Sequence, residues 1–253
     1  MKSVIAEEFE RYRDVFFSIT KNFQTGGKPI GPGSRNIVKV FEIEGKEYNF
    51  KSFKQHNFIN RHVYKYYRKS KARRSLEYAN LLIRKNFLTP KPVAYIENTD
   101  FWGVTSSYYI SEQLQDCFTL SDALFNPDFP NREKIFQAYT ALIFNLHENG
   151  IEFIDNASGN FLIKEDHNTY QFYLVDLNRM NFLNHYPIEK RLSNFERLTT
   201  APEIIKIISE EYALLSGKSP EFCQQKILSA TNRKVRKNKI KKNLKFYKYF
   251  LKK

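Results

Sequence analysis

The stretch LHENGIEFIDNASGNFLIK at residues 146–164, with QFYLVDLNRM at residues 171–180, decides how the fold is interpreted. Asp155 is followed five residues later by Asn160, and Asp176 comes sixteen residues after that. One apolar run follows Asn160 and a second precedes Asp176. This order predicts a loop, a strand, a turn and a second strand, with polar side chains at the strand ends.

The spacing of these three polar residues is typical of phosphoryl transfer. In a kinase catalytic loop, an Asp orients the accepting hydroxyl and an Asn five residues later holds Mg²⁺. A second Asp, on the next strand, holds the metal that bridges the phosphates. Asp155, Asn160 and Asp176 fit these roles in order. The alternative is a pair of ordinary turns, since Asp and Asn are favoured there as well.

Composition predicts a globular chain of one mid-sized domain or two packed lobes. The chain has 253 residues, of which 42% are hydrophobic and 27% charged, enough for a sizeable core. Cys117 and Cys223 form neither a disulfide framework nor a metal-ligand spacing, so we expect a reducing compartment. No apolar run approaches the roughly 20 residues needed to span a bilayer. The amino terminus carries acids early and is not expected to be a signal peptide.

The net charge of +14 is concentrated in two segments. Residues 231–253 contain eleven Lys or Arg and no acid, so the rest of the chain nets only +3. Residues 51–74 contain nine more basic residues, again without an acid. Such clusters imply an anionic partner, whether nucleic acid, acidic lipid or a phosphorylated glycan.

The first third of the chain is predicted to form a short helix, an edge strand or loop, and then a hairpin. Strands are expected at residues 36–43 and 47–53, with Gly45 in the tight connection. The preceding loop holds Gly31 and Gly33, with Val38 further on. Such a glycine-rich loop lets backbone N–H groups approach phosphates, although an ordinary loop has the same composition.

Lys51 lies on the second strand of this hairpin, where a lysine can point towards the phosphates of a nucleotide. Strand alternation places its rival, Lys54, on the opposite face. Glu77 lies on a predicted helix with an apolar stripe, which ends before Pro90. A glutamate there can pair with Lys51 and hold it in place. The alternative for each lysine is a solvated position at a sheet edge.

The remaining elements follow in the same pattern. Strands at 93–96 and 104–110 lead to Glu112 and Leu114, where backbone groups would meet an adenine ring. Residues 132–149 predict a helix ended by Gly150, with His147 as a packing or capping residue. Further helices are expected at three segments: 188–198, 202–215, and 220–230 continuing into the basic tail.

Both basic segments have an alternative structural explanation. Residues 56–74 interleave aromatic and basic side chains, which suits a membrane surface or an anionic ligand, but also an amphipathic helix packed on the domain. The tail at 231–253 has apolar positions at helical spacing and suits a basic helix on acidic lipid. The alternative for the tail is a solvated, frayed extension.

Taken together, these elements resemble the bacterial lipopolysaccharide core kinases, which phosphorylate Kdo or heptose and belong to the protein-kinase-like superfamily. The resemblance covers roughly residues 26–200. Six segments carry it: GPGSRNIVKV, FKSFK, SLEYANLL, TPKPVAYIE, LHENGIEFIDNASGNFLI and LVDLNR.

The resemblance implies an α+β, bilobal protein-kinase-like fold, with an antiparallel sheet and one main helix in the N-lobe and a mostly helical C-lobe. The corresponding boundaries are residues 1–115 for the N-lobe with the hinge, 116–230 for the C-lobe, and 231–253 for the basic tail.

The resemblance also implies ATP and Mg²⁺ as cofactors and a role for each site residue. Catalysis would involve Asp155, Lys51 and Glu77, and Asn160 and Asp176 would bind the metal. ATP would be bound by Gly31, Gly33, Val38, Lys51, Glu112 and Leu114.

The chain departs from protein kinases at several positions. Phe153 and Ile154 stand where those enzymes have His-Arg, and Ala157 replaces a lysine, so another base must offset the γ-phosphate charge, or none does. Asn178 replaces the Gly of D-F-G. Ala201-Pro202-Glu203 matches a protein-kinase triplet, which we interpret as chance. These departures favour a glycan or small-molecule kinase.

The predicted function is therefore an ATP- and Mg²⁺-dependent sugar kinase that acts on lipid-linked core oligosaccharide. It would be cytoplasmic and peripheral on the inner face of the inner membrane, with its basic segments holding the acidic membrane or an anionic glycan; nucleic acid is not expected. The alternatives are a protein kinase or another small-molecule kinase of the same fold, and a pseudokinase or basic membrane- or nucleic-acid-binding protein.

Overall fold

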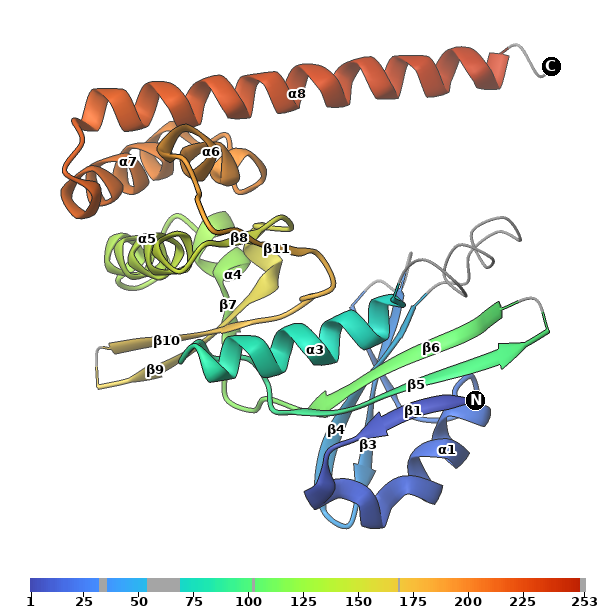
Figure 1. The fold of residues 1–253 in the computed structure, drawn as a ribbon. Coiled ribbons are helices and arrows are strands. Elements are labelled where there is room, and N and C mark those ends of the chain that lie inside the picture. Colours follow the sequence, from blue (N-terminus) through green and yellow to red (C-terminus); the bar gives the residue numbers. More distant parts are fainter. Residues whose placement is uncertain (32–35, 54–68, 102, 168, 251–253) are drawn as a thin grey trace. The chain divides into compact units, whose positions relative to one another are not determined.

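The computed structural model forms two compact units (Figure 1). The first comprises residues 1–117 and 173–178, and the second residues 118–172 and 179–253. The structure describes the backbone of residues 1–31, 36–53, 69–101, 103–167 and 169–250, and side chains as far as residue 243. Gly33, Lys54 and most of the basic segment at 56–74 lie outside these residues.

The first unit is built on a six-stranded antiparallel sheet in the order β1-β5-β6-β4-β3-β2. Its strands are β1 (Lys2–Ile5), β2 (Lys28–Ile30), β3 (Asn36–Ile43), β4 (Lys46–Phe53), β5 (Pro92–Asp100) and β6 (Gly103–Glu112). Both strands of the predicted hairpin are confirmed. Its turn places Glu44 and Gly45 at φ 51° and 74°, and positive φ at both central residues matches the twist of the flanking strands.

The amino terminus differs from the predicted order of helix first and strand second. Lys2–Ile5 is an edge strand that pairs with β5, and the helices η1 (Glu7–Tyr12) and α1 (Arg13–Lys21) follow it. Ile5 is buried, and the Ala6 amide donates to the Val93 carbonyl at 2.9 Å. A partner strand almost 90 residues away therefore decides the conformation of this segment.

The two faces of the sheet are covered by different helices. Side chains of η1 and α1 pack with Tyr48, Phe50 and Ile110 on one face. The helix α3 (Lys71–Arg84) packs with Phe53 and Tyr95 on the other. Because side chains alternate along a strand, Lys51 lies on the α3 face.

The second unit is mostly helical, with two small sheets in the orders β10-β9-β7 and β11-β8. Its helices are α4 (Leu120–Phe125), α5 (Arg132–Glu148), η2 (Ser158–Asn160), α6 (Ile188–Ser193), η3 (Asn194–Arg197), α7 (Pro202–Ser216) and α8 (Pro220–Phe250). Its strands are β7 (Phe118–Thr119), β8 (Ile151–Phe153), β9 (Phe161–Asp166), β10 (Thr169–Leu174, whose last two residues belong to the first unit) and β11 (Met180–Phe182).

The core of the second unit forms around α5, which confirms the helix predicted at residues 132–149. Its apolar positions at helical spacing are buried, as expected of a helix that packs on a core. Tyr139 packs edge-to-face against Phe161 and Phe195, with ring centroids 5.0 and 6.2 Å apart. Burying each such side chain stabilises the fold by about 1.5–3 kcal/mol.

The helix α8 continues the predicted 220–230 helix into the basic tail. Residues 235–243 are all exposed, including Val235 and Ile240. No helix in the described part of the chain is long and apolar enough to cross a bilayer.

Gly150 ends α5 and directs the chain into β8 and the loop that carries Asp155. Its φ is +68°, and a Cβ at this position would lie 2.0 Å from the Leu183 carbonyl oxygen. The Leu183 amide in turn donates to the Gly150 carbonyl at 2.7 Å. Gly217, which ends α7 with φ +67°, has no atom within 4 Å of the same position.

We expect Gly150→Ala to destabilise the protein more than Gly217→Ala. Both replacements impose a left-handed conformation on a residue with a Cβ, at a cost of about 1–2 kcal/mol. Only the first adds overlap with a backbone carbonyl, which costs about 1–3 kcal/mol more. Urea denaturation of the two variants measures the difference, and equal losses would contradict the role assigned to the Leu183 contact.

Candidate active site

Within the first unit, an ion pair joins two residues that the sequence placed in the same site. Lys51 Nζ on β4 lies 2.7 Å from Asp176 Oδ1, and the two side chains are only 15% and 27% exposed. Asp176 reaches this unit because the segment before it joins the Leu88 region: the Leu174 amide donates to the Leu88 carbonyl at 3.0 Å. The ammonium group of Lys51, which is predicted to bind phosphate, therefore contacts the carboxylate of Asp176, which is predicted to bind the metal.

The backbone at Asp176 adopts an uncommon conformation. Its φ is +60°, a left-handed conformation that Asp tolerates better than most residues but that still costs free energy. The Asn178 amide, which is buried, donates a hydrogen bond to Asp176 Oδ1. Asn178, at the position of the Gly in D-F-G, thus helps to hold the carboxylate in place.

Glu77 has other partners than the sequence predicted. It accepts hydrogen bonds from Lys69 at 2.8 Å and Arg73 at 2.9 Å, so the predicted ion pair with Lys51 is not formed here. Burial would raise the pKa of Glu77, but the bonds from Lys69 and Arg73 hold it below its usual value. Arg73 was not predicted as a partner of Glu77. It lies four residues before Glu77 on α3, a spacing at which side chains on a helix are neighbours. A Lys51 pair would require Glu77 to leave both partners.

Four of the residues predicted to contact the nucleotide through the glycine-rich loop and the hinge lie in the described part of the chain: Gly31, Val38, Glu112 and Leu114. Gly31 has φ +73° and open space where a Cβ would be, and Val38 lies opposite Lys51 in the hairpin. At the end of β6, the Glu112 and Gln113 amides already donate to the Lys91 and Glu47 carbonyls, both at 2.9 Å.

The amide of Leu114 differs from its two predecessors. Within the described residues no hydrogen bond engages it, whereas its carbonyl accepts a bond from the Gln113 side chain at 3.2 Å. Of the amides at residues 112–114, that of Leu114 is therefore the one left to donate to an adenine ring.

Within the second unit, Asp155 lies between two guanidinium groups. Arg179 Nη1 and Arg197 Nη1 are 3.1 and 2.9 Å from Asp155 Oδ1. The Asp155 side chain is 13% exposed, so these pairs are partly shielded from solvent. One carboxylate and two guanidinium groups leave a local charge of +1, which suits an anionic ligand.

The loop after Asp155 also orients Asn160. The Asp155 carbonyl accepts hydrogen bonds from the Ala157 amide and from Asn160 Nδ2, both at 2.7 Å. Since Nδ2 is engaged there, the amide oxygen is the atom of Asn160 that remains for a metal.

The donor set predicted for Mg²⁺ fits that ion chemically. A carboxylate and an amide oxygen are hard ligands of the kind Mg²⁺ prefers, completed by water and phosphate oxygens. The described residues contain no cluster of three or more His, Cys, Asp or Glu side chains that would form a different metal site.

Residues 33–216 match the Lipopolysaccharide kinase (Kdo/WaaP) family. The chain belongs to this family. The match spans more than half of the chain and confirms the family predicted from the sequence. The protein is therefore a kinase, and membership of a kinase family implies that it uses ATP. No curated protein matches the sequence.

A solved structure of WaaP supports the kinase-like fold. The structure of "WaaP in complex with acyl carrier protein" matches with a TM-score of 0.64 and 16% identity, over 94% of this kinase and 99% of that chain. A structure of WbdD matches with a TM-score of 0.46 and 17% identity, over 82% of this kinase and 45% of that chain.

The two arginines beside Asp155 were missed in the sequence analysis for different reasons. Arg179 lies in the LVDLNR motif of the kinase, three residues after Asp176, so a signal was present. Arg197 is 42 residues from Asp155 on the short helix η3, and no local pattern marks it.

A buried polar network holds the loop around Asp155 against the helices of the second unit. Asn194 Nδ2 donates to the Phe153 carbonyl at 2.9 Å. Asn156 donates to the Asn194 carbonyl at 3.2 Å and accepts from the Tyr139 hydroxyl at 2.6 Å. Breaking such a network leaves a buried polar group unpaired, at a cost of about 1–3 kcal/mol.

His147 completes this network as the predicted packing residue. Its Nε2 lies 3.2 Å from Asn194 Oδ1 and its Nδ1 lies 2.9 Å from the Tyr212 hydroxyl. Because an amide oxygen only accepts, Nε2 carries the proton and Nδ1 accepts from Tyr212. Burial is the main reason why the pKa of His147 is lowered to about 3, so the ring is neutral at neutral pH.

We expect the stabilising effect of His147 to depend on pH. An unfolded histidine binds a proton near pH 6.5, whereas the folded one does so only near pH 3. Between these values the unfolded state binds more protons, so wild-type stability falls as pH decreases.

The stability of the wild type is compared with that of His147→Gln at each pH. His185→Gln is the control, because His185 is exposed. The stability gap between wild type and His147→Gln should be largest above pH 6.5 and shrink by about 1 kcal/mol per pH unit below it. Chemical denaturation from pH 7.5 to 5 measures the gap. A gap that stays constant with pH would show that His147 is not buried as a neutral ring.

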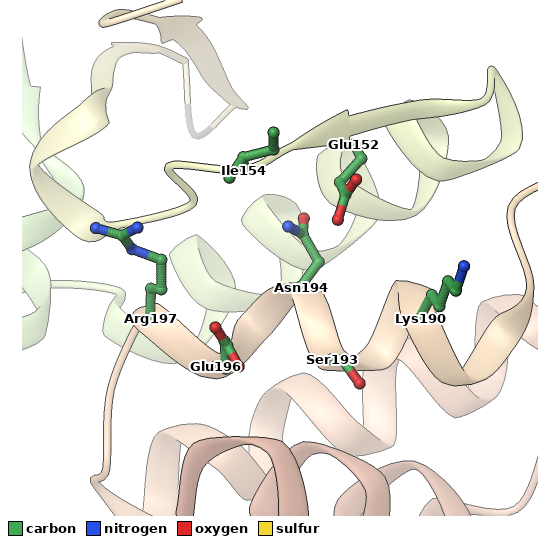
Figure 2. Close-up of a pocket in the computed structure, with 7 residues that line it drawn as sticks. All are labelled: Glu152, Ile154, Lys190, Ser193, Asn194, Glu196 and Arg197. Atoms are coloured by element: carbon green, nitrogen blue, oxygen red, sulfur yellow. The ribbon is translucent and has the colours of Figure 1, made fainter. Parts of the chain in front are cut away.

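A polar pocket of about 200 Å³ lies in the second unit beside Asp155 (Figure 2). Ile154, the residue before Asp155, contributes to its wall, and β8 supplies Glu152. The remaining side chains come from α6 and η3: Lys190, Ser193, Asn194, Glu196 and Arg197. Arg197 therefore contacts both the pocket and Asp155.

Proposed function

We propose that this kinase transfers the γ-phosphoryl group of Mg²⁺-ATP to a hydroxyl of a Kdo or heptose residue in the lipopolysaccharide inner core. The Lys51–Asp176 ion pair is the observation that carries the proposal. The two residues are 125 positions apart in the chain and lie 2.7 Å apart in the structure. In a kinase, these two charges contact the phosphates and the metal of the same nucleotide.

Each remaining residue has a role in this proposal that follows from its chemistry. Lys51 binds the α- and β-phosphates, and the Leu114 amide donates to adenine. Asp155 orients the acceptor hydroxyl and accepts its proton. Asn160 and Asp176 would hold Mg²⁺, which supplies charge neutralisation at the phosphates. Catalysis is then mainly positioning and electrostatic stabilisation.

Arg179 and Arg197 account for a departure from protein kinases. Ala157 stands where those enzymes carry a lysine close to the transferred phosphoryl group. Two guanidinium groups on Asp155 place positive charge at the carboxylate that the acceptor approaches. Guanidinium groups bind phosphate oxygens in bidentate geometry, so they are suited to stabilise the phosphoryl group during transfer.

Two isosteric variants test this proposal. Asp155→Asn should reduce transfer to a Kdo- or heptose-containing acceptor by about 100-fold or more, and keep the thermal stabilisation produced by Mg²⁺-ATP. Asp176→Asn should lose both transfer and the Mg²⁺-dependent part of that stabilisation. Transfer by Asp155→Asn at the wild-type rate would remove this residue from the mechanism, and no Mg²⁺-ATP stabilisation of the wild type would contradict the nucleotide site.

We also propose that the basic tail holds the kinase at the cytoplasmic face of the inner membrane. The exposed part of α8 carries five basic residues between 236 and 242 and no acid. Each lysine near an acidic lipid surface contributes about 1 kcal/mol. The acyl carrier protein named for the WaaP structure is a second candidate partner for this helix.

Replacing Lys237, Lys239, Lys241 and Lys242 with Gln should weaken binding to vesicles containing acidic lipid by at least about 100-fold. Turnover on a short, soluble acceptor should stay close to the wild-type rate. Sedimentation with acidic and with neutral vesicles measures the first effect. Unchanged vesicle binding, with loss of acyl carrier protein binding instead, would assign the helix to the carrier protein.

A further inference from the structure

The pocket beside Asp155 contains four charged side chains, of which two are paired with residues outside it. Glu196 Oε1 lies 2.9 Å from Lys234 Nζ on α8. Arg197 Nη1 lies 2.9 Å from Asp155 Oδ1. Figure 2 shows Arg197 and Glu196 toward one end of the pocket and Lys190 toward the other.

The other two charges have no ionic partner in the part of the chain that the structure describes. Within the described residues no carboxylate lies within ion-pair distance of Lys190. Glu152 accepts a hydrogen bond from Asn181 Nδ2 at 2.7 Å. The pocket therefore presents one unpaired ammonium group and one unpaired carboxylate.

The size and lining of the pocket restrict what it can bind. Pockets for drug-sized ligands occupy about 300–1,000 Å³ and are mostly apolar. This one is about 200 Å³ and has a single aliphatic side chain, Ile154, in its wall. A small, polar, two-sign pocket suits one sugar ring, since hydroxyl groups both donate and accept hydrogen bonds.

We infer that this pocket binds the acceptor sugar and that the sugar carries an acidic group, which Lys190 binds while Glu152 accepts a hydrogen bond from a ring hydroxyl. This inference rests on the proposed function, because it names the acceptor subsite of the same reaction. The Arg197 guanidinium spans the distance between pocket and Asp155, so a sugar held here lies next to the residue that orients its hydroxyl.

The two acceptors that the proposed function leaves open, Kdo and heptose, differ in their charge. Kdo carries a carboxylate, whereas an unsubstituted heptose has no charge for Lys190 to bind. A heptose bearing a phosphate has the required charge. The shared chemistry is an anionic group on the acceptor sugar, and the experiment must distinguish its two sources.

The test varies the charge on the protein and on the acceptor together. The acceptors are a Kdo-containing oligosaccharide, the methyl ester of its carboxylate, and heptose acceptors with and without a phosphate. The variant is Lys190→Gln, and the control is Lys206→Gln. Lys206 is an exposed lysine on α7 whose Nζ lies 3.8 Å from Glu210. Both side chains are exposed, so neither substitution should impair folding.

For the wild type, we expect the KM of the preferred acidic acceptor to be at least about ten-fold below that of its neutral counterpart. Lys190→Gln should raise the KM for the acidic acceptor by about ten-fold and leave the KM for the neutral one unchanged. The KM for ATP and all constants of the control should stay at wild-type values. Preference for the carboxylate identifies Kdo as the source of charge, and preference for the phosphate identifies the substituted heptose.

Two results would overturn the inference while leaving the proposed function standing. One is wild-type transfer that does not distinguish acidic from neutral acceptors. The other is a Lys190→Gln variant that affects both kinds of acceptor equally or neither. Absence of wild-type transfer to all of these sugars would instead contradict the proposed function itself.

Discussion

The hydrogen bonds of Asn194 are the constraint on which the catalytic loop depends. This buried side chain contacts the Phe153 carbonyl on one side and His147 on the other, and its own carbonyl accepts from Asn156. Phe153 and Asn156, on either side of Asp155, are thus both bonded to Asn194. Because buried polar groups are costly to leave unpaired, the loop has one favourable conformation, and that conformation sets the direction of the Asp155 side chain.

Each of the two aspartates of the candidate site has at least one basic partner. Asp176 is paired with Lys51 in the first unit, and Asp155 with Arg179 and Arg197 in the second. An oppositely charged partner offsets part of the cost of desolvating a carboxylate and holds it in position. Phosphates bring their own negative charge, so a lysine or guanidinium that exchanges a carboxylate contact for a phosphate contact keeps an anionic partner.

Several elements were predictable because their signals are local. The hairpin at 36–53, the long helix α5 and the glycine that ends α5 follow from alternation, helical periodicity and the helix-ending preference of glycine. The order of Asp155, Asn160 and Asp176 was also visible, and it led to the family that the comparison confirmed. Other features depend on tertiary contacts. The strand β1 forms an edge strand because β5 offers a free edge. Glu77 forms ion pairs with Lys69 and Arg73 and not with Lys51.

The sequence by itself determined the kinase family, most of the strands and helices beyond the amino terminus, and the residue types available for chemistry. These are set by spacing and by local backbone preference, which a single chain segment contains. Only the tertiary structure decided that Arg197 reaches Asp155 and that Lys190 and Glu152 meet around one pocket. Such contacts join segments about 40 residues apart, and burial and charge pairing arise only when those segments pack together.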